Sequence, residues 1–450
     1  MTKKQRVVIV GAVAAGTSAA AKAKRVNPDL EVILLERDPY ISYGACGLPY
    51  FIAGLIPNVE TLIARSPAEF QKQGIEVRIR HEVREIDPKE MSLRVVDLET
   101  AKEYRLPYDQ LVIATGALSF RPPVPGLDLP GVFTLRTLSD GLALSEALRR
   151  KRPKNVVIVG GGYIGLEMAE AFRALDLPVT IVEMASQLMV NLDEDMSKLV
   201  FAEVERHGVR VLLNDGLVRC EGNDHVEKVV TQHNEIPADL VLLAIGVRPN
   251  VQLAQQAGIQ LGAGKAIAVD KHMRTNIEGI YAAGDCADTM HGVTGERIYI
   301  PLGTTANKQG RVAGANIAGM DCTFEGVVGT AVAKIFDLEV ARTGLTEKEA
   351  TAKGINVHAV SIRTTDRARY YPGATELHVK LVMDRTTRRL LGAQFIGAHG
   401  AAKRIDVLAA ALYAKMTVDD LTRLDYSYAP PYASVWDATL IAANVASRCS

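Results

Sequence analysis

Two segments of the chain share one pattern of residues, and this repeat limits the possible folds more than any other feature. The first βαβ unit begins RVVIVGAVAAG and covers residues 6–36, and the second βαβ unit begins NVVIVGGGYIG and covers residues 155–183. Each reads as a short β-branched strand, a glycine turn, an alanine-rich helix and a second strand that ends on glutamate. This pattern is typical of dinucleotide binding, so the sequence predicts an α/β fold with two Rossmann-like domains.

The glycines of such a unit have separate mechanical tasks. One makes the tight turn, one lets the backbone approach the pyrophosphate, and one lets helix and strand pack closely, while helix N-terminal amides attract the phosphate charge. The glycines in question are Gly11 and Gly16 in the first unit and Gly160, Gly162 and Gly165 in the second. The first unit has Val13 at the middle position. Two such patterns in one chain predict two dinucleotide sites.

Each unit ends on an acid, Glu36 or Glu183, which can accept hydrogen bonds from a ribose diol. The carboxylate of Glu183 would also repel a 2′-phosphate, and the MASQ sequence that follows it offers no arginine to bind one. The second site is therefore expected to favour NADH over NADPH.

Three further stretches indicate how the domains are divided. Segments 111–126 and 240–250 each run from a buried strand into a glycine turn and a proline-containing loop, so each can be a crossing between domains. The segment TNIEGIYAAGDCAD ends a strand at Gly284 and Asp285, where an aspartate can reach a ribityl hydroxyl or a phosphate-bound water. From about residue 323, strand-like runs and an alanine-rich helix near 401–415 indicate a third domain.

Composition and charge exclude several classes of partner. The chain has 52 basic and 52 acidic residues among 450, which speaks against nucleic acid or a membrane surface as a partner, and no apolar run approaches the roughly 18 residues of a membrane span. The nine histidines show no metal-ligand spacing, so no metal site is predicted. An odd number of scattered cysteines, at positions 46, 220, 286, 322 and 449, favours a reducing cytoplasm over a disulfide framework.

With these pieces the chain resembles the two-dinucleotide flavoprotein disulfide reductases over nearly its whole length. The resemblance rests on the two units with their acids, on ATG at 114–116, on YAAGD at 281–285 and on the C-terminal domain. It implies FAD at the first unit, with contributions from Thr115, Gly116 and Asp285, a nicotinamide cofactor at the second, and a homodimer formed by an α+β C-terminal domain. The expected domains are 1–118 with 247–322 for FAD, 119–246 for NAD(P)H and 323–450 for dimerisation.

The cysteine pattern narrows this resemblance. Members that use an internal disulfide carry C-x4-C and a His-Pro step, but Cys46 has no such partner in ISYGACGLPYF, and no His-Pro occurs. NADH peroxidases and water-forming oxidases carry a histidine where this chain has Ala14. The chain looks most like coenzyme A disulfide reductases and the similar persulfide reductases, through Ser42 and Cys46, YYPG at 370–373, KRIDVL at 403–408 and YAPPY at 428–432. Ala45 departs from the asparagine that is common in the coenzyme A enzymes.

A lone redox cysteine can store oxidising equivalents only as a mixed disulfide with an outside sulfur or as a sulfenate. We therefore expect Cys46 to alternate between a thiolate and a Cys46–S–S–CoA adduct. The thiolate is the nucleophile, so the pKa of Cys46 is expected to be lowered by a helix that begins in GLPYFIAG and by the flavin ring.

The resemblance implies roles for four more side chains. Tyr370 and Tyr428 would reach Cys46 from the other subunit and protonate departing thiolates. Tyr163 would cover the flavin until NADH displaces it, and Glu167 would orient the nicotinamide. Interface packing is the alternative for the tyrosines, and ordinary helix-start chemistry is the alternative for Glu167.

Coenzyme A carries several phosphate charges, which a neutral protein must bind with a local basic patch. Ser18, Lys22 and Arg25 fall on one face of the first predicted helix and are candidates, although a solvated helix face explains this spacing equally well. Three other functions remain open: a persulfide or polysulfide reductase, an NADH oxidase, and a flavin redox sensor that binds a partner protein.

Overall fold

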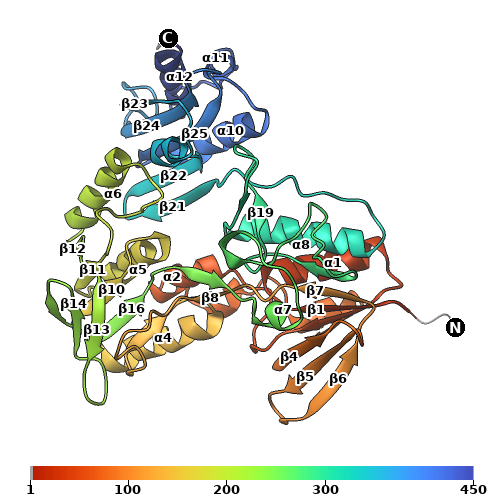
Figure 1. Ribbon diagram of the computed structural model, residues 1–450. Coiled ribbons are helices and arrows are strands. Elements are labelled where there is room, and N and C mark those ends of the chain that lie inside the picture. The colour runs from red at the N-terminus through yellow and green to blue at the C-terminus, as the bar shows by residue number, and fades with distance from the viewer. Residues whose placement is uncertain (1–3, 449–450) are drawn as a thin grey trace.

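The computed structural model describes residues 4–448 and arranges them in three lobes (Figure 1). The first lobe, in red and orange with later green and cyan segments, contains the first βαβ unit. The second lobe, in yellow and green, contains the second unit, and the third lobe, in blue, is the C-terminal sheet with its helices. Cys449 lies outside the described residues.

The first lobe is built on a parallel five-stranded sheet in the order β18-β7-β1-β2-β3. Its inner strands are buried on both faces, which is why they read as continuous apolar runs. The sheet and its principal helices are β1 (Arg6–Val10), α1 (Ala14–Val26), β2 (Glu31–Leu35), β3 (Ile75–Arg78), β7 (Gln110–Ile113), β18 (Ile280–Ala282) and α8 (Gly303–Ile317). Gly310 and Gly314 let α8 lie directly on α1, since a Cβ on either would come within 2.2 Å of an α1 carbonyl oxygen.

Smaller elements complete this lobe and bring the thiol region to it. They are η1 (Ala45–Gly47), α2 (Leu48–Ile52), η2 (Val59–Leu62), α3 (Pro67–Lys72), β4 (His81–Asp87), β5 (Ser92–Asp97), β6 (Glu103–Pro107), α7 (Gln252–Gln256), η3 (Ala263–Lys265), β19 (Thr289–Met290) and β20 (Arg297–Ile298). Strands β4, β5 and β6 form a separate antiparallel sheet.

The second lobe repeats the architecture with a parallel sheet in the order β12-β11-β10-β16-β9. Its elements are β9 (Val132–Thr134), α4 (Leu138–Lys151), β10 (Val156–Val159), α5 (Tyr163–Ala174), β11 (Val179–Val182), α6 (Glu194–Arg206), β12 (Arg210–Leu212), β13 (Leu217–Glu221), β14 (Lys228–Thr231), β15 (Glu235–Pro237) and β16 (Leu240–Leu243). The two expected crossings, β8 (Ala117–Ser119) and β17 (Val247–Pro249), pair with each other in antiparallel fashion. The prediction of two Rossmann-like domains is confirmed.

The third lobe is an antiparallel sheet in the order β21-β22-β25-β24-β23, with helices α10 and α12 packed on it. Its elements are β21 (Ala331–Ile335), β22 (Leu338–Gly344), α9 (Glu347–Ala352), β23 (Val357–Thr365), β24 (Glu376–Asp384), β25 (Leu390–Gly397), α10 (Ala401–Tyr413), α11 (Val418–Leu421) and α12 (Ala438–Arg448). This arrangement confirms the predicted α+β C-terminal domain.

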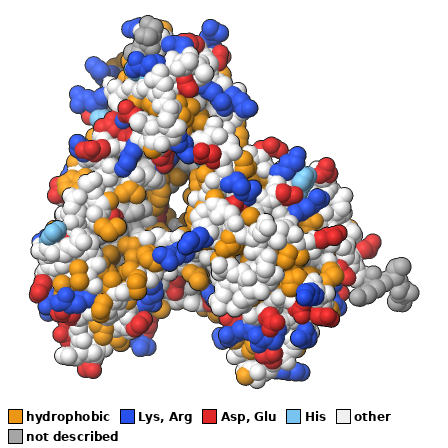
Figure 2. Space-filling view, viewed as in Figure 1, with side chains coloured by type: hydrophobic (Ala, Val, Ile, Leu, Met, Phe, Trp, Pro, Cys, Tyr) orange, Lys and Arg blue, Asp and Glu red, His pale blue; other side chains and the backbone are white. Residues whose placement is uncertain are grey.

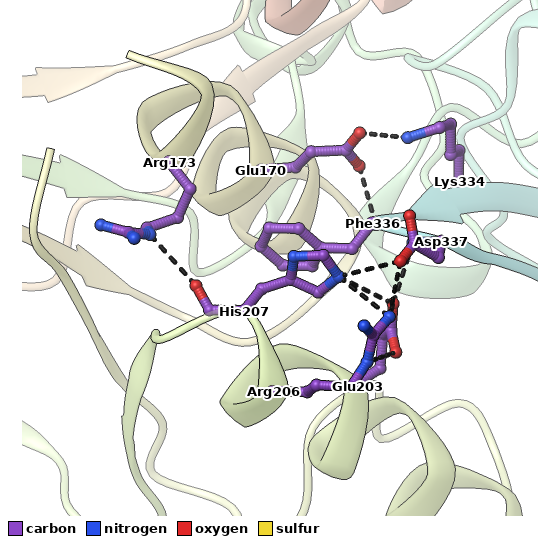
Figure 3. Close-up of polar contacts among 8 residues, drawn as sticks. All are labelled: Glu170, Arg173, Glu203, Arg206, His207, Lys334, Phe336 and Asp337. Atoms are coloured by element: carbon purple, nitrogen blue, oxygen red, sulfur yellow. Dashed lines mark hydrogen bonds and ion pairs between the residues drawn. The ribbon is translucent and has the colours of Figure 1, made fainter. Parts of the chain in front are cut away.

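Polar contacts join the second and third lobes (Figure 3). Glu170 of α5 pairs with Lys334 of β21, and Arg206 of α6 bonds to Asp337 at 2.6 Å. The His207 ring stacks on Phe336 with 4.3 Å between ring centroids. Within residues 4–448, no helix is both long and apolar enough to cross a membrane.

Candidate functional site

The two glycine turns have nearly the same backbone geometry. Gly11 has φ +103° and Gly160 has φ +109°, and an added Cβ would lie 2.2 Å from Ala114 O in the first turn and 2.4 Å from Ala244 O in the second. Side chains are therefore excluded at both positions by conformation and by space. The turn that the sequence predicted is present in both units.

The last glycine of each turn is also required by packing. A Cβ on Gly16 would lie 1.8 Å from Gly11 O, and one on Gly165 would lie 2.0 Å from Gly160 O. At Gly162, in contrast, a Cβ would meet nothing within 4 Å, and the backbone is extended at φ −88° and ψ −169°. The protein itself does not require glycine at position 162, so the space there fits the close approach of a ligand.

The two terminal acids make matching contacts. Glu36 accepts hydrogen bonds from the backbone N–H groups of Ala12 at 2.8 Å and Asp38 at 3.0 Å. Glu183 accepts from Gly161 and Ala185, both at 2.7 Å. Burial raises the pKa of Glu36, and its two backbone bonds oppose that rise. Each carboxylate is thus fixed beside its glycine turn.

Thr115, Gly116 and Asp285 come together around the crossing strands. The hydroxyl of Thr115 donates to Asn250 O at 2.7 Å, and Gly116 O accepts from Asn250 N at 2.9 Å, so this ATG segment fixes the second crossing. Asp285 forms an ion pair with Arg136, a residue that the sequence analysis did not identify. Arg136 follows strand β9 in the second lobe, and no local pattern distinguishes it.

The thiol lies at the boundary between the first and second lobes. Cys46 is exposed in η1, directly before the short helix α2. Ser42 anchors this segment to the first glycine turn, because its N–H donates to Ala12 O at 2.8 Å. Ser42 has φ +49°, a left-handed conformation that costs energy for a residue with a side chain and that often occurs at functional sites.

The pKa of the Cys46 thiol was expected to be lowered. The protein's own groups raise it instead, so this expectation is wrong as far as they are concerned. Desolvation by the surrounding atoms raises the pKa of Cys46 even though the residue is exposed, and the nearby carboxylate of Glu167 raises it further. Arg136 acts in the opposite direction. Helix α2 forms where expected, but it has only five residues, so its positive end does not outweigh burial.

Glu167 itself is a perturbed acid. Burial, with a smaller contribution from Glu170, raises its pKa to about 7. It lies on α5 one helical turn after Tyr163, so the two side chains share a face, and α5 contacts α2, the short helix that follows Cys46. Tyr163 is half-buried, and its hydroxyl accepts a hydrogen bond from Asn191 at 2.8 Å.

Tyr370 and Tyr428 lie together on the surface of the third lobe. Their hydroxyl oxygens are 3.2 Å apart, and 75% of Tyr370 and 47% of Tyr428 is exposed in the single chain. Their mutual hydrogen bond raises the pKa of Tyr370. The two motifs YYPG and YAPPY thus meet at one polar point of an exposed aromatic surface.

The proposed phosphate patch is only partly available. Ser18 donates its hydroxyl hydrogen to Asn307 at 2.7 Å and is used in packing α1 on α8. Lys22 is half-buried and Arg25 is exposed on the same helix. The structure therefore leaves two of the three candidates for an anion.

One acid and histidine cluster has metal-like proximity. The side chains of Glu203, His207 and Asp337 lie close enough to share a cation. No other group of acids, histidines or cysteines in residues 4–448 is spaced in this way. Arg206 Nη2 contacts all three, at 2.9 Å from Glu203, 3.1 Å from His207 and 2.6 Å from Asp337 (Figure 3). A guanidinium already supplies the positive charge, so the cluster is an ion-pair contact between lobes.

The three lobes surround an opening in the middle of the face seen in Figure 2. Residues of all three lobes contribute to one apolar cluster, including Leu48 of α2, Leu166 of α5 and Ile335 of β21. The thiol segment, the start of α5 and the C-terminal sheet are therefore held in fixed relation by a shared core.

Known proteins match this chain over nearly its whole length. The Pyridine nucleotide-disulphide oxidoreductase family matches residues 5–310, and its dimerisation domain matches residues 330–439. An NAD(P)H sulfur oxidoreductase (CoA-dependent) of Pyrococcus abyssi is 42% identical over 98% of this chain and 98% of its own. A coenzyme A disulfide reductase of Staphylococcus haemolyticus is 30% identical over 95% of this chain and 96% of its own. The solved NAD-dependent persulfide reductase from A. fulgidus is 40% identical with a TM-score of 0.96, over 99% of this chain and 83% of that one.

Proposed function

Because the chain belongs to the pyridine nucleotide-disulphide oxidoreductase family and is an NAD(P)H-dependent flavoprotein, we propose that it reduces coenzyme A disulfide through Cys46 alone. The observation that carries this proposal is the distribution of sulfur. Cys220 and Cys286 are buried in separate cores, Cys322 lies near the end of α8, and all four described cysteines are free. Among residues 4–448, no protein sulfur pairs with Cys46, and we propose that its disulfide partner comes from the substrate.

FAD, when bound, takes a hydride from NADH and supplies two electrons to sulfur. The Cys46 thiolate attacks one sulfur of the substrate disulfide, which breaks the S–S bond, forms a mixed disulfide and releases one thiolate. Two electrons then cleave the mixed disulfide and return Cys46 and the second product as thiolates. Each released thiolate takes a proton, for which Tyr370 and Tyr428 of the second subunit of the homodimer are the proposed donors.

We assign FAD to residues 1–118 and 247–322, where Gly11, Gly16, Glu36, Thr115, Gly116 and Asp285 would hold it. The nicotinamide cofactor is assigned to residues 119–246, with Gly160, Gly162, Gly165 and Glu183, and residues 323–450 form the dimer. Both carboxylate oxygens of Glu183 are tied to backbone N–H groups, so the charge is fixed at the ribose position and disfavours a 2′-phosphate. NADH is therefore the preferred donor, and Ser42, Lys22 and Arg25 are the proposed contacts of coenzyme A.

Mass spectrometry of the purified protein under non-reducing conditions tests the substrate. A coenzyme A adduct on Cys46 is expected, together with disulfide-dependent NADH oxidation that Cys46→Ser reduces by at least a hundredfold. The variant should still bind FAD and accept electrons from NADH, which separates loss of the thiol from misfolding.

A persulfide or polysulfide reductase is the second candidate, because the A. fulgidus relative is named as a persulfide reductase. An added sulfur atom on Cys46 in place of coenzyme A would support it. A sulfenate or sulfinate as the sole adduct would indicate an NADH oxidase, and absence of disulfide-dependent NADH consumption would indicate a redox sensor.

A further inference from the structure

The turn at residues 188–193 joins the second glycine turn to the C-terminal sheet. On one side, Met189 N donates to Gly161 O at 2.9 Å, and the amide of Asn191 donates to the Tyr163 hydroxyl at 2.8 Å. No motif in the sequence distinguishes Asn191. Its side chain nevertheless holds the ring of Tyr163, the residue directly after Gly162.

Two side chains of the third lobe hold the other side of this turn. Arg342 donates to Asn191 O at 2.5 Å, and Gln394 exchanges hydrogen bonds with Asp193 at 2.9 and 2.6 Å. Arg342 and Gln394 are direct cross-strand partners on β22 and β25, so they act from one rigid position. The turn is consequently anchored to the sheet, and Asn191 presents its amide to Tyr163 from a fixed backbone.

Tyr163 lies directly after the space at Gly162 and packs against the apolar cluster that includes Tyr43 and Leu48, on either side of Cys46. It opens α5, and this helix contacts α2, the short helix after Cys46. A dinucleotide whose pyrophosphate approaches Gly162 and whose nicotinamide extends toward the thiol segment would then meet the tyrosine ring and displace it. Displacing the ring breaks the bond to Asn191.

We propose that Asn191 is a positioning residue that holds the Tyr163 ring in its resting place, so that breaking this hydrogen bond is part of the cost of NADH binding. The proposal rests on the assignment of NADH to the second unit. It does not depend on Cys46 or on the identity of the disulfide, because both act after the nucleotide has bound.

The test is rapid mixing of the FAD-loaded protein with NADH, without oxygen or disulfide, to give the apparent Kd for NADH and the limiting rate of flavin reduction. Asn191→Ala and Tyr163→Phe remove the same bond, so each should lower the apparent Kd about threefold to tenfold. The double variant should show no further decrease, because the two effects share one interaction. The limiting rate should change less than the Kd.

Two variants serve as controls. Asn191→Asp keeps a bond, since the tyrosine hydroxyl can donate to the carboxylate, and should behave nearly as the unmodified protein. Asn155→Ala makes the same substitution at the opposite end of β10, where the amide donates to Asp239, and should leave the Kd unchanged.

Three results would overturn the proposal: additive effects of Asn191→Ala and Tyr163→Phe, an unchanged Kd in Asn191→Ala, or a Kd that rises in parallel with lost thermal stability. If NADH reduces the flavin normally but no disulfide is consumed, the proposed function fails while this inference stands.

Discussion

The first and second βαβ units share a backbone but differ in the side chains that follow the glycine turn. In both, the first glycine donates its N–H across the sheet at 2.8 Å, to Leu35 O in one unit and to Val182 O in the other. In both, a terminal glutamate accepts two backbone hydrogen bonds. These shared features build a cradle for a pyrophosphate and a ribose, and they do not distinguish one dinucleotide from another.

The differences begin directly after the first glycine. The first unit continues with Ala12, Val13 and Ala14, where the second has Gly161, Gly162 and Tyr163. The surroundings differ as well, because α1 is covered by α8, whereas α5 contacts α2 and the edge of the C-terminal sheet. Helix α1 is covered within its own lobe, whereas α5 contacts elements of the other two lobes, among them the helix that follows Cys46. This contrast fits a permanently bound cofactor at the first unit and an exchanging one at the second.

The largest expected effect comes from alanine at the packing glycine of each unit. A Cβ at position 16 or 165 would lie within 2.0 Å of a carbonyl oxygen, so Gly16→Ala and Gly165→Ala should each lower the free energy of unfolding by roughly 3 kcal/mol. Gly16→Ala should also lose bound flavin, and Gly165→Ala should keep flavin but lose NADH binding. Urea unfolding, flavin absorbance and NADH titration measure these changes. Gly216→Ala, which meets only the flexible Gln232, is the control, and flavin loss in Gly165→Ala alone would reverse the assignment of the units.

A smaller effect is expected when the second turn is given the side chain of the first. A Cβ at position 162 meets no protein atom within 4 Å, and the extended backbone there accepts a side chain, so the thermal stability of Gly162→Val should be unchanged. The apparent Kd for NADH should rise by tenfold or more, because the branched side chain occupies the space of the pyrophosphate. Calorimetry and NADH titration check the two expectations. Full NADH affinity in this variant would show that the nucleotide does not approach Gly162.

The smallest effect concerns Glu167, whose charge raises the pKa of Cys46, at the position of α5 where α1 has Ser18. The pKa of Glu167 is about 7, so its charge raises the pKa of Cys46 chiefly above that pH. Glu167→Gln should lower the midpoint of Cys46 alkylation by roughly half to one pH unit, with little change in rate below pH 7. The pH profile of alkylation by iodoacetamide measures this shift. Glu205→Gln, an exposed acid on α6, should not change the profile; an unchanged midpoint in Glu167→Gln would remove Glu167 from the environment of the thiol.

The sequence predicted some parts of the site better than others. Gly11, Gly160 and the acids Glu36 and Glu183 were found because each unit is continuous in the chain and its spacing follows from local backbone geometry. Residues whose partners are distant in the chain, such as Arg136 beside Asp285 and Asn191 beside Tyr163, were missed, because nothing in their neighbouring sequence marks them. The effect of the protein's own groups on the pKa of Cys46 was missed for the same reason: the short helix is local, whereas the burial and the Glu167 carboxylate are not.

The sequence by itself determined that this chain forms two dinucleotide units, a third domain and one thiol without a local partner. Glycine conformation, strand patterning and the absence of a nearby cysteine depend on neighbouring residues, so a linear chain records them directly. Only the tertiary structure decided which charges surround that thiol, how Tyr163 is held and which surface carries Tyr370 with Tyr428. Electrostatic and hydrogen-bond energies depend on distances through space, and residues far apart in the chain set those distances only after the lobes have packed together.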